Sequence, residues 1–381
     1  MEPDSRILVV MLFVLAVAAI VGVMRLRLLA VRLVSGLLAI VLSAAAGIAV
    51  VNDYYAYYQS WSQLSSDLSG SYSNFNATPA AIRTASAAGD GHVESVLLRG
   101  SISGITRRGL VYLPPQYSEP AYAHTAFPVV ELVHGTPGDP LRWIVQMRVA
   151  HVLDQLIDDH RMGPVIAVMP AMATGRHYEE CVDAPKALDD TYLTRDVRAD
   201  VLARFRASPV PAEWGIAGFS SGGYCAANLA LRHRASFGAA GIMDGYFRPS
   251  DGPAAAALHF NRAAEDANDP LLAARRLGSG THPLPSFWLM AGTGDKGDYV
   301  AAQAFVHALH GVDAVTLHRE PSATHNYRAW RAADPAMLSW LWTQLAPPDL
   351  RVQFPITGSV GLKRVATRDH AVTRGVTQPP G

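Results

Sequence analysis

The segment around Ser220 has a residue pattern that can make a serine hydroxyl nucleophilic. The apolar run Trp214–Phe219 leads into a G-x-S-x-G pattern over 218–222, and a helix-forming stretch follows directly. A serine on such a sharp strand-to-helix turn projects its hydroxyl above the sheet, and the flanking glycines avoid a collision between strand and helix. The pattern predicts Ser220 as a nucleophile. The alternative is a serine-bearing tight turn without chemistry.

A serine hydroxyl needs a general base, and that base needs a carboxylate to orient it. In a hydrolase built on this turn, the chain order is serine, then acid, then histidine. His325 lies in 321–327, a predicted loop between the last strand and the last helix. We therefore predict His325 as the base.

Three carboxylates are candidates for the acid. Asp295 ends a glycine-rich turn after the apolar strand predicted over 285–291, and it is the preferred candidate. Asp298 is the alternative acid, although it could equally be the N-cap of a helix predicted over 298–310. Asp244, at the end of the preceding strand, is a more distant third choice.

Two backbone N–H groups are expected to stabilise the oxyanion. One belongs to Ser221, at the start of the helix after the nucleophile, where the helix dipole also favours negative charge. The other belongs to Thr136, which follows an apolar strand and the His134-Gly135 pair. His134 precedes the serine in the chain, so we expect it to brace this loop rather than to act as the base.

These residues need a scaffold, and the chain from Val93 onward alternates short β-rich runs with amphipathic stretches. The first two runs have no helix between them and predict an antiparallel hairpin, whereas the later alternation predicts a mostly parallel sheet with helices on both faces. The expected strands are 94–102, 107–113, 128–133, 164–169, 214–219, 238–243, 285–291 and 313–319, and the expected helices lie near 141–158, 194–206, 222–233, 298–310 and 334–345. The irregular segments 170–193 and 244–284 follow strand ends and are candidates for a lid and a substrate wall.

The N-terminal part of the chain predicts a transmembrane helical hairpin. Residues 7–24 and 33–51 carry no charge, and each would span roughly 27–28 Å as a helix, close to the hydrocarbon thickness of a bilayer. The connecting turn holds Arg25, Arg27 and Arg32, and the next Lys or Arg after the second run is Arg83. The positive-inside rule places the turn in the cytoplasm and the rest of the chain outside it.

These predictions divide the chain into four regions. The hairpin occupies 1–62 and ends in an aromatic cluster, Tyr54 to Trp61, that fits an interfacial belt. A linker of small and polar residues covers 63–92, the catalytic domain covers 93–346, and a mobile tail covers 347–381. The localisation expected is a cell membrane, crossed twice, with the catalytic domain on the outside.

Charge and cysteine content exclude some functions. Lys and Arg together number 32, as do Asp and Glu, so the chain lacks the basic surface that nucleic acid requires. Cys181 and Cys225 have no zinc-ligand spacing, and no second ligand cluster supports a metal site at 177–181. A disulfide between these two cysteines is expected if the domain lies outside the cytoplasm, and it would tie the lid to the helix after Ser220.

The chain contains the segments HGTPG, ECVD, TYLTRDV, GFSSGG, AGTGD and ATHNYRAW. Together with the motifs above, these segments resemble those of a known family. The chain is similar to the esterase-D-type esterases, which are α/β-hydrolases related to S-formylglutathione hydrolase and to actinobacterial mycolyltransferases. The resemblance spans about 93–345 and implies an acyl-enzyme mechanism with no metal or organic cofactor. Carried over by motif, it implies a triad of Ser220, Asp295 and His325 and oxyanion donors at Thr136 and Ser221.

The expected function is a membrane-anchored extracytoplasmic serine esterase that hydrolyses carboxylic esters. The anchor alone favours a lipid or cell-envelope ester as the substrate. Two alternatives stay open: an acyltransferase that moves the acyl group to a sugar or lipid alcohol, and a catalytically silent domain that binds the envelope.

Overall fold

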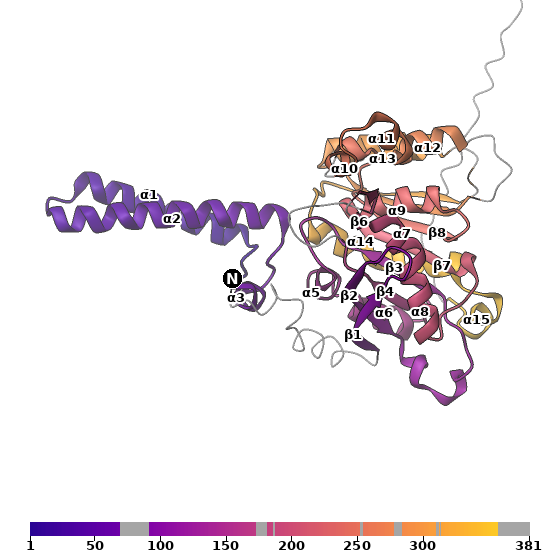
Figure 1. The fold of residues 1–381 in the computed structure, drawn as a ribbon. Helices are drawn as coiled ribbons and strands as arrows, with labels where there is room; N and C mark the ends of the chain where they lie inside the picture. The colour runs from indigo at the N-terminus through magenta and orange to yellow at the C-terminus, as the bar shows by residue number, and fades with distance from the viewer. Residues whose placement is uncertain are drawn as a thin grey trace, which may run out of the picture.

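In the computed structural model, a long helical hairpin projects from an α/β domain (Figure 1). The structure describes residues 1–68, 91–172, 181–185, 187–251, 254–277, 284–309, 312 and 314–356 of the 381-residue chain. Most of the expected linker, the part of the lid over 173–180 and the tail beyond 356 therefore lie outside the described residues.

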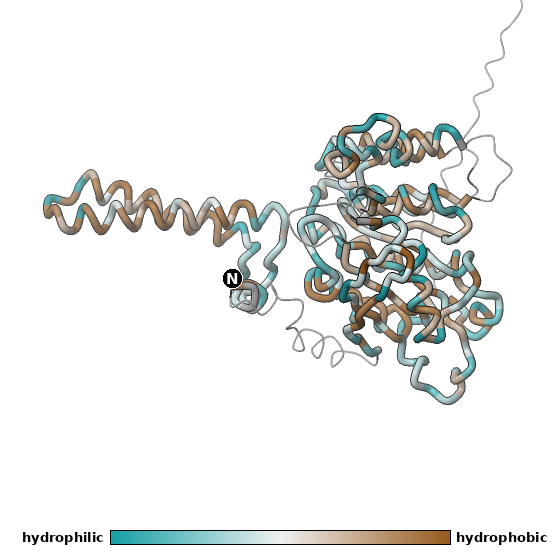
Figure 2. Tube along the Cα trace, in the orientation of Figure 1, coloured by the Kyte–Doolittle hydropathy of each residue, from teal (hydrophilic) through white to brown (hydrophobic). Residues whose placement is uncertain are grey.

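The hairpin consists of α1 (Arg6–Arg25) and α2 (Leu29–Tyr55), which pack side by side. Both helices are long and apolar enough to cross a membrane, and the hydropathy colouring shows apolar residues along their length (Figure 2). Large apolar side chains stay exposed on both, among them Ile7 at 69% and Ile40 at 69%. The two apolar helices expected from the sequence are therefore present, with the exposed apolar surface of helices that pack little against the rest of the protein.

The end of α2 is fixed by its own polar residues. The side-chain amide of Asn52 donates to the carbonyl of Tyr58 at 2.8 Å and accepts from its N–H at 2.8 Å. Ala56 ends the helix in the left-handed conformation, with φ of 50°. The chain then turns into the short helix α3 (Trp61–Leu68).

The α/β domain is built on an eight-stranded sheet of order β1-β2-β4-β3-β7-β8-β9-β10. β1 pairs antiparallel with β2, and β2 pairs antiparallel with β4, while all the other pairings are parallel. The mostly parallel sheet predicted from the sequence is confirmed. The strands are β1 (His92–Arg99), β2 (Thr106–Leu113), β3 (Val129–Val133), β4 (Ile166–Met169), β7 (Trp214–Phe219), β8 (Ala239–Met243), β9 (Ser286–Gly292) and β10 (Val315–Glu320).

The strand order reverses at β3, which has β4 on one side and β7 on the other. In open α/β sheets, ligands bind in the crevice outside the carboxyl ends of the strands at such a reversal. The loop that begins at His134 follows β3, and Ser220 follows β7. The topology alone therefore brings the predicted nucleophile and the predicted oxyanion loop to the same crevice.

Helices cover both faces of the sheet, and each face has its own apolar core. Along β3, Val129 and Val133 point into one core while Val130 and Leu132 point into the other, as the period of two in a strand requires. The first core is closed by α8 (Val197–Arg204), α9 (Ser221–Arg232) and α13 (Lys296–Ala308), and the second by α5 (Leu141–Val145), α6 (Val149–Asp158) and α14 (Tyr327–Leu345).

The remaining strands and α-helices are short and lie mostly in the two segments predicted to be irregular. They are β5 (Asp183–Ala184), β6 (Ala187–Leu188), α7 (Asp189–Thr191), α10 (Ala254–Ala257), α11 (Arg262–Ala267), α12 (Pro270–Leu277) and, near the C-terminus, α15 (Pro348–Gln353).

Several helix boundaries differ from the sequence expectation. The helix expected near 141–158 is divided into α5 and α6, because Arg148 between them has φ of 56°, and the helix expected near 194–206 is the shorter α8.

Two further differences, both at helix starts, lie near the site. The helix expected from 334 begins at Tyr327, because Asn326 caps it by accepting from the Ala329 N–H at 2.9 Å, and the helix then continues through Pro335. The helix expected from 298 begins at Lys296. The second difference changes the interpretation of the site.

Candidate active site

Ser220 sits in a strained turn between β7 and α9. Its backbone has φ of 56° and ψ of −125°, a conformation that costs free energy and persists only where the surroundings hold it. The Ser220 N–H donates to the carbonyl of Met243 at 2.9 Å. A Cβ at Gly218 would overlap the backbone of Gly222, and a Cβ at Gly222 would overlap the carbonyl of Val133. The flanking glycines are therefore required by backbone contacts.

Three side chains form a continuous hydrogen-bond chain at this turn. The Ser220 Oγ lies 2.9 Å from His325 Nε2, and His325 Nδ1 lies 2.6 Å from Asp298 Oδ2. His325 comes from the loop between β10 and α14, and Asp298 comes from the first turn of α13. The serine, histidine and carboxylate thus meet at one end of the sheet, although 105 residues separate the first two.

The expectation that Asp295 pairs with the histidine is not met in the structure. Asp295 is the N-cap of α13, where its Oδ1 accepts from the N–H groups of Gly297 at 3.0 Å and Asp298 at 3.3 Å. The alternative acid, Asp298, lies three residues into this turn and contacts His325 instead. Compared with the expectation, Asp295 and Asp298 exchange the roles of helix cap and histidine partner. The reason is that the helix begins two residues earlier than the sequence suggested, so Asp295 and not Asp298 is the cap.

The environment of His325 favours its protonated form. Burial alone would lower the pKa of the imidazole, but the hydrogen bond to Asp298 and the negative charges of Asp298 and Asp244 outweigh burial and raise the pKa above the usual 6.5. Since Asp298 contacts Nδ1, that nitrogen carries the proton in the neutral ring. Nε2 is then free to accept a proton from Ser220.

Asp244, the third candidate acid, accepts hydrogen bonds from groups other than His325. Its Oδ2 accepts from Trp330 Nε1 at 2.8 Å, and its Oδ1 accepts from the Gly292 N–H at 3.0 Å. Burial raises the pKa of Asp244 to about 6, although these hydrogen bonds and His325 oppose the rise. The sequence did not suggest Trp330, whose ring packs edge-to-face on His325 with 5.0 Å between centroids and stacks on Phe219 at 4.8 Å. Trp330 is the last residue of the ATHNYRAW segment that carries the family resemblance, but that resemblance implies no role for it.

One predicted oxyanion donor, Ser221, directly follows the serine, and the other, Thr136, lines the same cavity as Ser220. α9 begins at Ser221, so the N–H of Ser221 belongs to the first turn and has no partner within the helix. His134 is buried, which lowers its pKa, and its Nδ1 lies 2.9 Å from the Gly135 carbonyl while its Nε2 accepts from the Met172 N–H at 3.2 Å. His134 therefore connects the oxyanion loop to the segment after β4.

A cavity of about 850 Å³ opens over Ser220 and His325. Its lining is predominantly aliphatic and aromatic, and it combines residues of the α/β domain with residues of α2. The lining residues are Ala44, Gly47, Ile48, Val51, Asn52, Tyr55, Tyr57, Tyr58, Gly135, Thr136, Pro137, Phe219, Ser220, His325, Tyr327 and Trp330. The contribution of α2 to this cavity was not predicted from the sequence.

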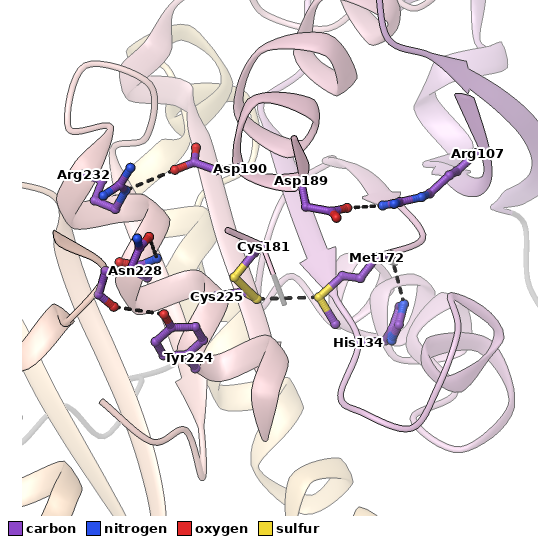
Figure 3. Close-up of a disulfide and its surroundings, with 11 residues drawn as sticks. Arg107, His134, Met172, Cys181, Asp189, Asp190, Tyr224, Cys225, Asn228 and Arg232 are labelled. Atoms are coloured by element: carbon purple, nitrogen blue, oxygen red, sulfur yellow. Dashed lines mark hydrogen bonds and ion pairs between the residues drawn. A yellow bond between two sulfur atoms is a disulfide. The ribbon is translucent and has the colours of Figure 1, made fainter. Parts of the chain in front are cut away.

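A disulfide joins Cys181 to Cys225, across 44 residues of sequence. Figure 3 shows it beside Met172, whose sulfur lies 3.5 Å from the Cys225 sulfur. The same segment is held to α9 a second time, because Asp190 Oδ2 accepts from Arg232 Nε at 3.1 Å. The end of the predicted lid is therefore attached to the helix that begins after the nucleophile.

Within the described residues, no group of three or more His, Cys, Asp or Glu side chains is placed to hold a metal ion. The segment 177–180, considered for such a site, lies outside the described residues.

Comparisons with known proteins identify the family of the chain. A family model described as "Putative esterase" matches residues 102–341, more than half of the chain. A protein of Corynebacterium glutamicum is 25% identical over 316 residues, which cover 78% of this chain and 72% of that protein.

Solved structures share the fold. A ferulic acid esterase superposes with a TM-score of 0.57 at 20% identity, covering 67% of this chain and 99% of its own. An S-formylglutathione hydrolase from Agrobacterium tumefaciens has a TM-score of 0.57 at 19% identity, covering 68% and 96%. A fluorophosphonate-binding serine hydrolase from Staphylococcus aureus has a TM-score of 0.55 at 17% identity, covering 66% and 98%. The resemblance drawn from the motifs is confirmed, and the chain belongs to this esterase family, with the α/β-hydrolase fold that these solved structures share.

Proposed function

We propose that the protein is a membrane-anchored esterase that hydrolyses lipid or cell-envelope esters through an acyl-enzyme on Ser220. In this proposal the hairpin within 1–62 is the anchor and 93–346 is the catalytic domain. The observation that carries the catalytic part is the hydrogen-bond chain from Ser220 through His325 to Asp298.

The first half of the reaction forms the acyl-enzyme. The Ser220 Oγ attacks the ester carbonyl carbon while its proton moves to Nε2 of His325. Negative charge develops on the carbonyl oxygen, where the N–H groups of Thr136 and Ser221 stabilise it. The bond to the alcohol oxygen then breaks, and the alcohol leaves with the proton from Nε2.

The second half regenerates the enzyme. A water molecule gives a proton to His325 Nε2 and attacks the acyl carbon, and collapse of the second oxyanion returns that proton to Ser220 and releases the acid. Asp298 keeps the proton of the neutral ring on Nδ1 and stabilises the imidazolium at each step. An alcohol in place of water would give acyl transfer, and analysis of products with and without a sugar or lipid alcohol distinguishes the two.

Three features support the membrane and external location. α1 and α2 have the length and composition of membrane spans. Three arginines, Arg25, Arg27 and Arg32, lie at the turn between them, which favours a cytoplasmic turn. A disulfide such as Cys181–Cys225 persists outside the reducing cytoplasm. Alkaline phosphatase, which is active only outside the cytoplasm, should be active when it is fused after residue 346. A reporter that is active only in the cytoplasm should be inactive at the same position, and its activity there would refute this location.

Labelling with a fluorophosphonate probe tests the nucleophile. The full-length protein in detergent should become labelled, the Ser220→Ala variant should not, and Ser101→Ala, at an exposed turn, should be labelled like the unmodified protein. Absence of labelling in the unmodified protein would favour a catalytically silent domain. Labelling that persists in Ser220→Ala would assign the nucleophile elsewhere.

A further inference from the structure

One wall of the active-site cavity is a face of the hairpin. Ala44, Ile48, Val51 and Tyr55 of α2 line the cavity together with Ser220 and His325. Their spacing of three and four residues places them on a single side of the helix. At 1.5 Å per residue, this stripe runs for about 16 Å along α2.

Contacts between the two parts hold this wall in place. The ring of Tyr57, just after α2, lies 4.9 Å beneath the Arg142 guanidinium and packs edge-to-face on Tyr327 at 5.8 Å. At the first turn of α14, a guanidinium nitrogen of Arg328 lies 3.0 Å from an Asp4 carboxylate oxygen and 3.8 Å from one of Asp53. Both ends of the hairpin are thus fixed to the catalytic domain within three residues of His325.

The stripe is apolar, and it faces open space. A Cβ on Gly47 would meet nothing within 4 Å, and the side chain of Ile48 is 72% exposed. The outer part of the stripe, from Ala44 to Val51, belongs to the uncharged run that would lie in the bilayer, while its inner end adjoins the catalytic serine. One apolar surface therefore connects the membrane to the site of reaction.

We propose that α2 forms part of the acyl-binding site, and that the substrate is a bilayer lipid ester whose hydrocarbon chain lies along the stripe from Ala44 to Tyr55 while its carbonyl carbon reaches Ser220. This proposal rests on the esterase function proposed above. It assigns the hairpin a second role beyond anchoring: the lipid enters sideways from the membrane and does not have to cross water.

The test uses full-length protein in phosphatidylcholine proteoliposomes with two substrates, p-nitrophenyl acetate and p-nitrophenyl palmitate. Gly47→Trp places a bulky ring in the open space of the stripe, and Val50→Trp is the matched control on the same helix. Val50 is 52% exposed and is absent from the cavity lining.

We expect Gly47→Trp to lower kcat/KM for the palmitate about tenfold or more, because each methylene removed from apolar contact changes binding about threefold to fourfold. The acetate, whose acyl group does not reach the stripe, should lose activity by a smaller factor than the palmitate, and Val50→Trp should affect neither substrate. An unchanged palmitate rate, or an equal fall for both substrates in Gly47→Trp, would overturn the proposal.

A second comparison tests whether the lipid enters the site from the bilayer. Palmitate ester placed in the same vesicles as the protein should be hydrolysed faster than ester placed in separate protein-free vesicles, and equal initial rates would overturn entry from the bilayer. Failure of the underlying esterase function is distinguishable, because it would abolish fluorophosphonate labelling and acetate hydrolysis in the unmodified protein.

Discussion

The imidazole Nδ1 of His325 lies 2.6 Å from the Oδ2 of Asp298. Asp298 holds this position because it is the third residue of α13, and Asp295, which caps the helix, accepts the Asp298 backbone N–H. Two aspartates three residues apart therefore have separate tasks. One contacts the histidine, and the other fixes the turn that presents the first.

The two aspartates can be separated by matched substitutions. Asp298→Asn should lower kcat about 10³–10⁴-fold, because the ring loses the anion that selects its tautomer and stabilises the imidazolium. Asp295→Asn keeps an N-cap oxygen and should lower kcat less than about tenfold. The measurement is p-nitrophenyl ester hydrolysis by both variants at one pH. A larger loss in Asp295→Asn would show that Asp295 is the functional acid.

The pH profile reports the protonation of His325. The base must be neutral to accept the serine proton, so kcat/KM should fall as the pH drops through the raised pKa of His325, with a midpoint above 6.5. Residual activity of Asp298→Asn should have its midpoint at lower pH, because the anion that raises the pKa is gone. A midpoint that does not move between the two proteins would contradict the pairing.

Glu131 should make stability depend on pH. It is buried in β3, and burial raises its pKa from 4.5 to about 8, although the charge of Arg198 opposes the rise. The folded state keeps a proton that the unfolded state loses, so the contribution of Glu131 to stability is present below pH 4.5 and is lost as the pH rises through about 8.

Glu131→Gln cannot titrate and provides the comparison. Relative to the unmodified protein, its free energy of unfolding should increase between pH 4.5 and 8 by an amount on the order of 3–5 kcal/mol. Urea unfolding in detergent, followed by tryptophan fluorescence, measures this difference at each pH. A difference that is constant over the window would refute the buried neutral carboxyl.

Removal of the disulfide should destabilise the catalytic domain. The bond closes a loop of 44 residues, for which the chain-entropy relation gives about 4 kcal/mol. A Cys181→Ser, Cys225→Ser double variant should therefore unfold at lower urea concentration, and the unmodified protein should approach it after reduction. Identical urea midpoints for the double variant and the oxidised unmodified protein would contradict this expectation.

Much of the architecture could be predicted because it depends on local patterns. The apolar strands, the glycine-flanked Ser220 and the loop histidine His325 are each specified within a few residues of sequence. The sequence favours Asp295 over Asp298 as the acid, because it predicts the start of α13 two residues too late. That difference decides which aspartate caps the helix and which one contacts His325.

Other features depend on contacts between distant segments. Trp330 lies on a helix whose start was expected seven residues later, at 334, so the sequence placed it in a loop and did not predict its contact with His325. The cavity wall formed by α2 results from the docking of Tyr57 between Arg142 and Tyr327. Each of these residues is an unremarkable aromatic or charged side chain until the two parts of the chain are brought together.

The most direct measurement is the capture of the acyl-enzyme itself. Full-length protein mixed rapidly with p-nitrophenyl butyrate and quenched in acid should release a burst of p-nitrophenol, and mass spectrometry should find the butyryl group on Ser220. His325→Ala should show neither the burst nor the adduct. A butyryl group on any other residue, or steady hydrolysis without a covalent adduct under single-turnover conditions, would contradict the mechanism.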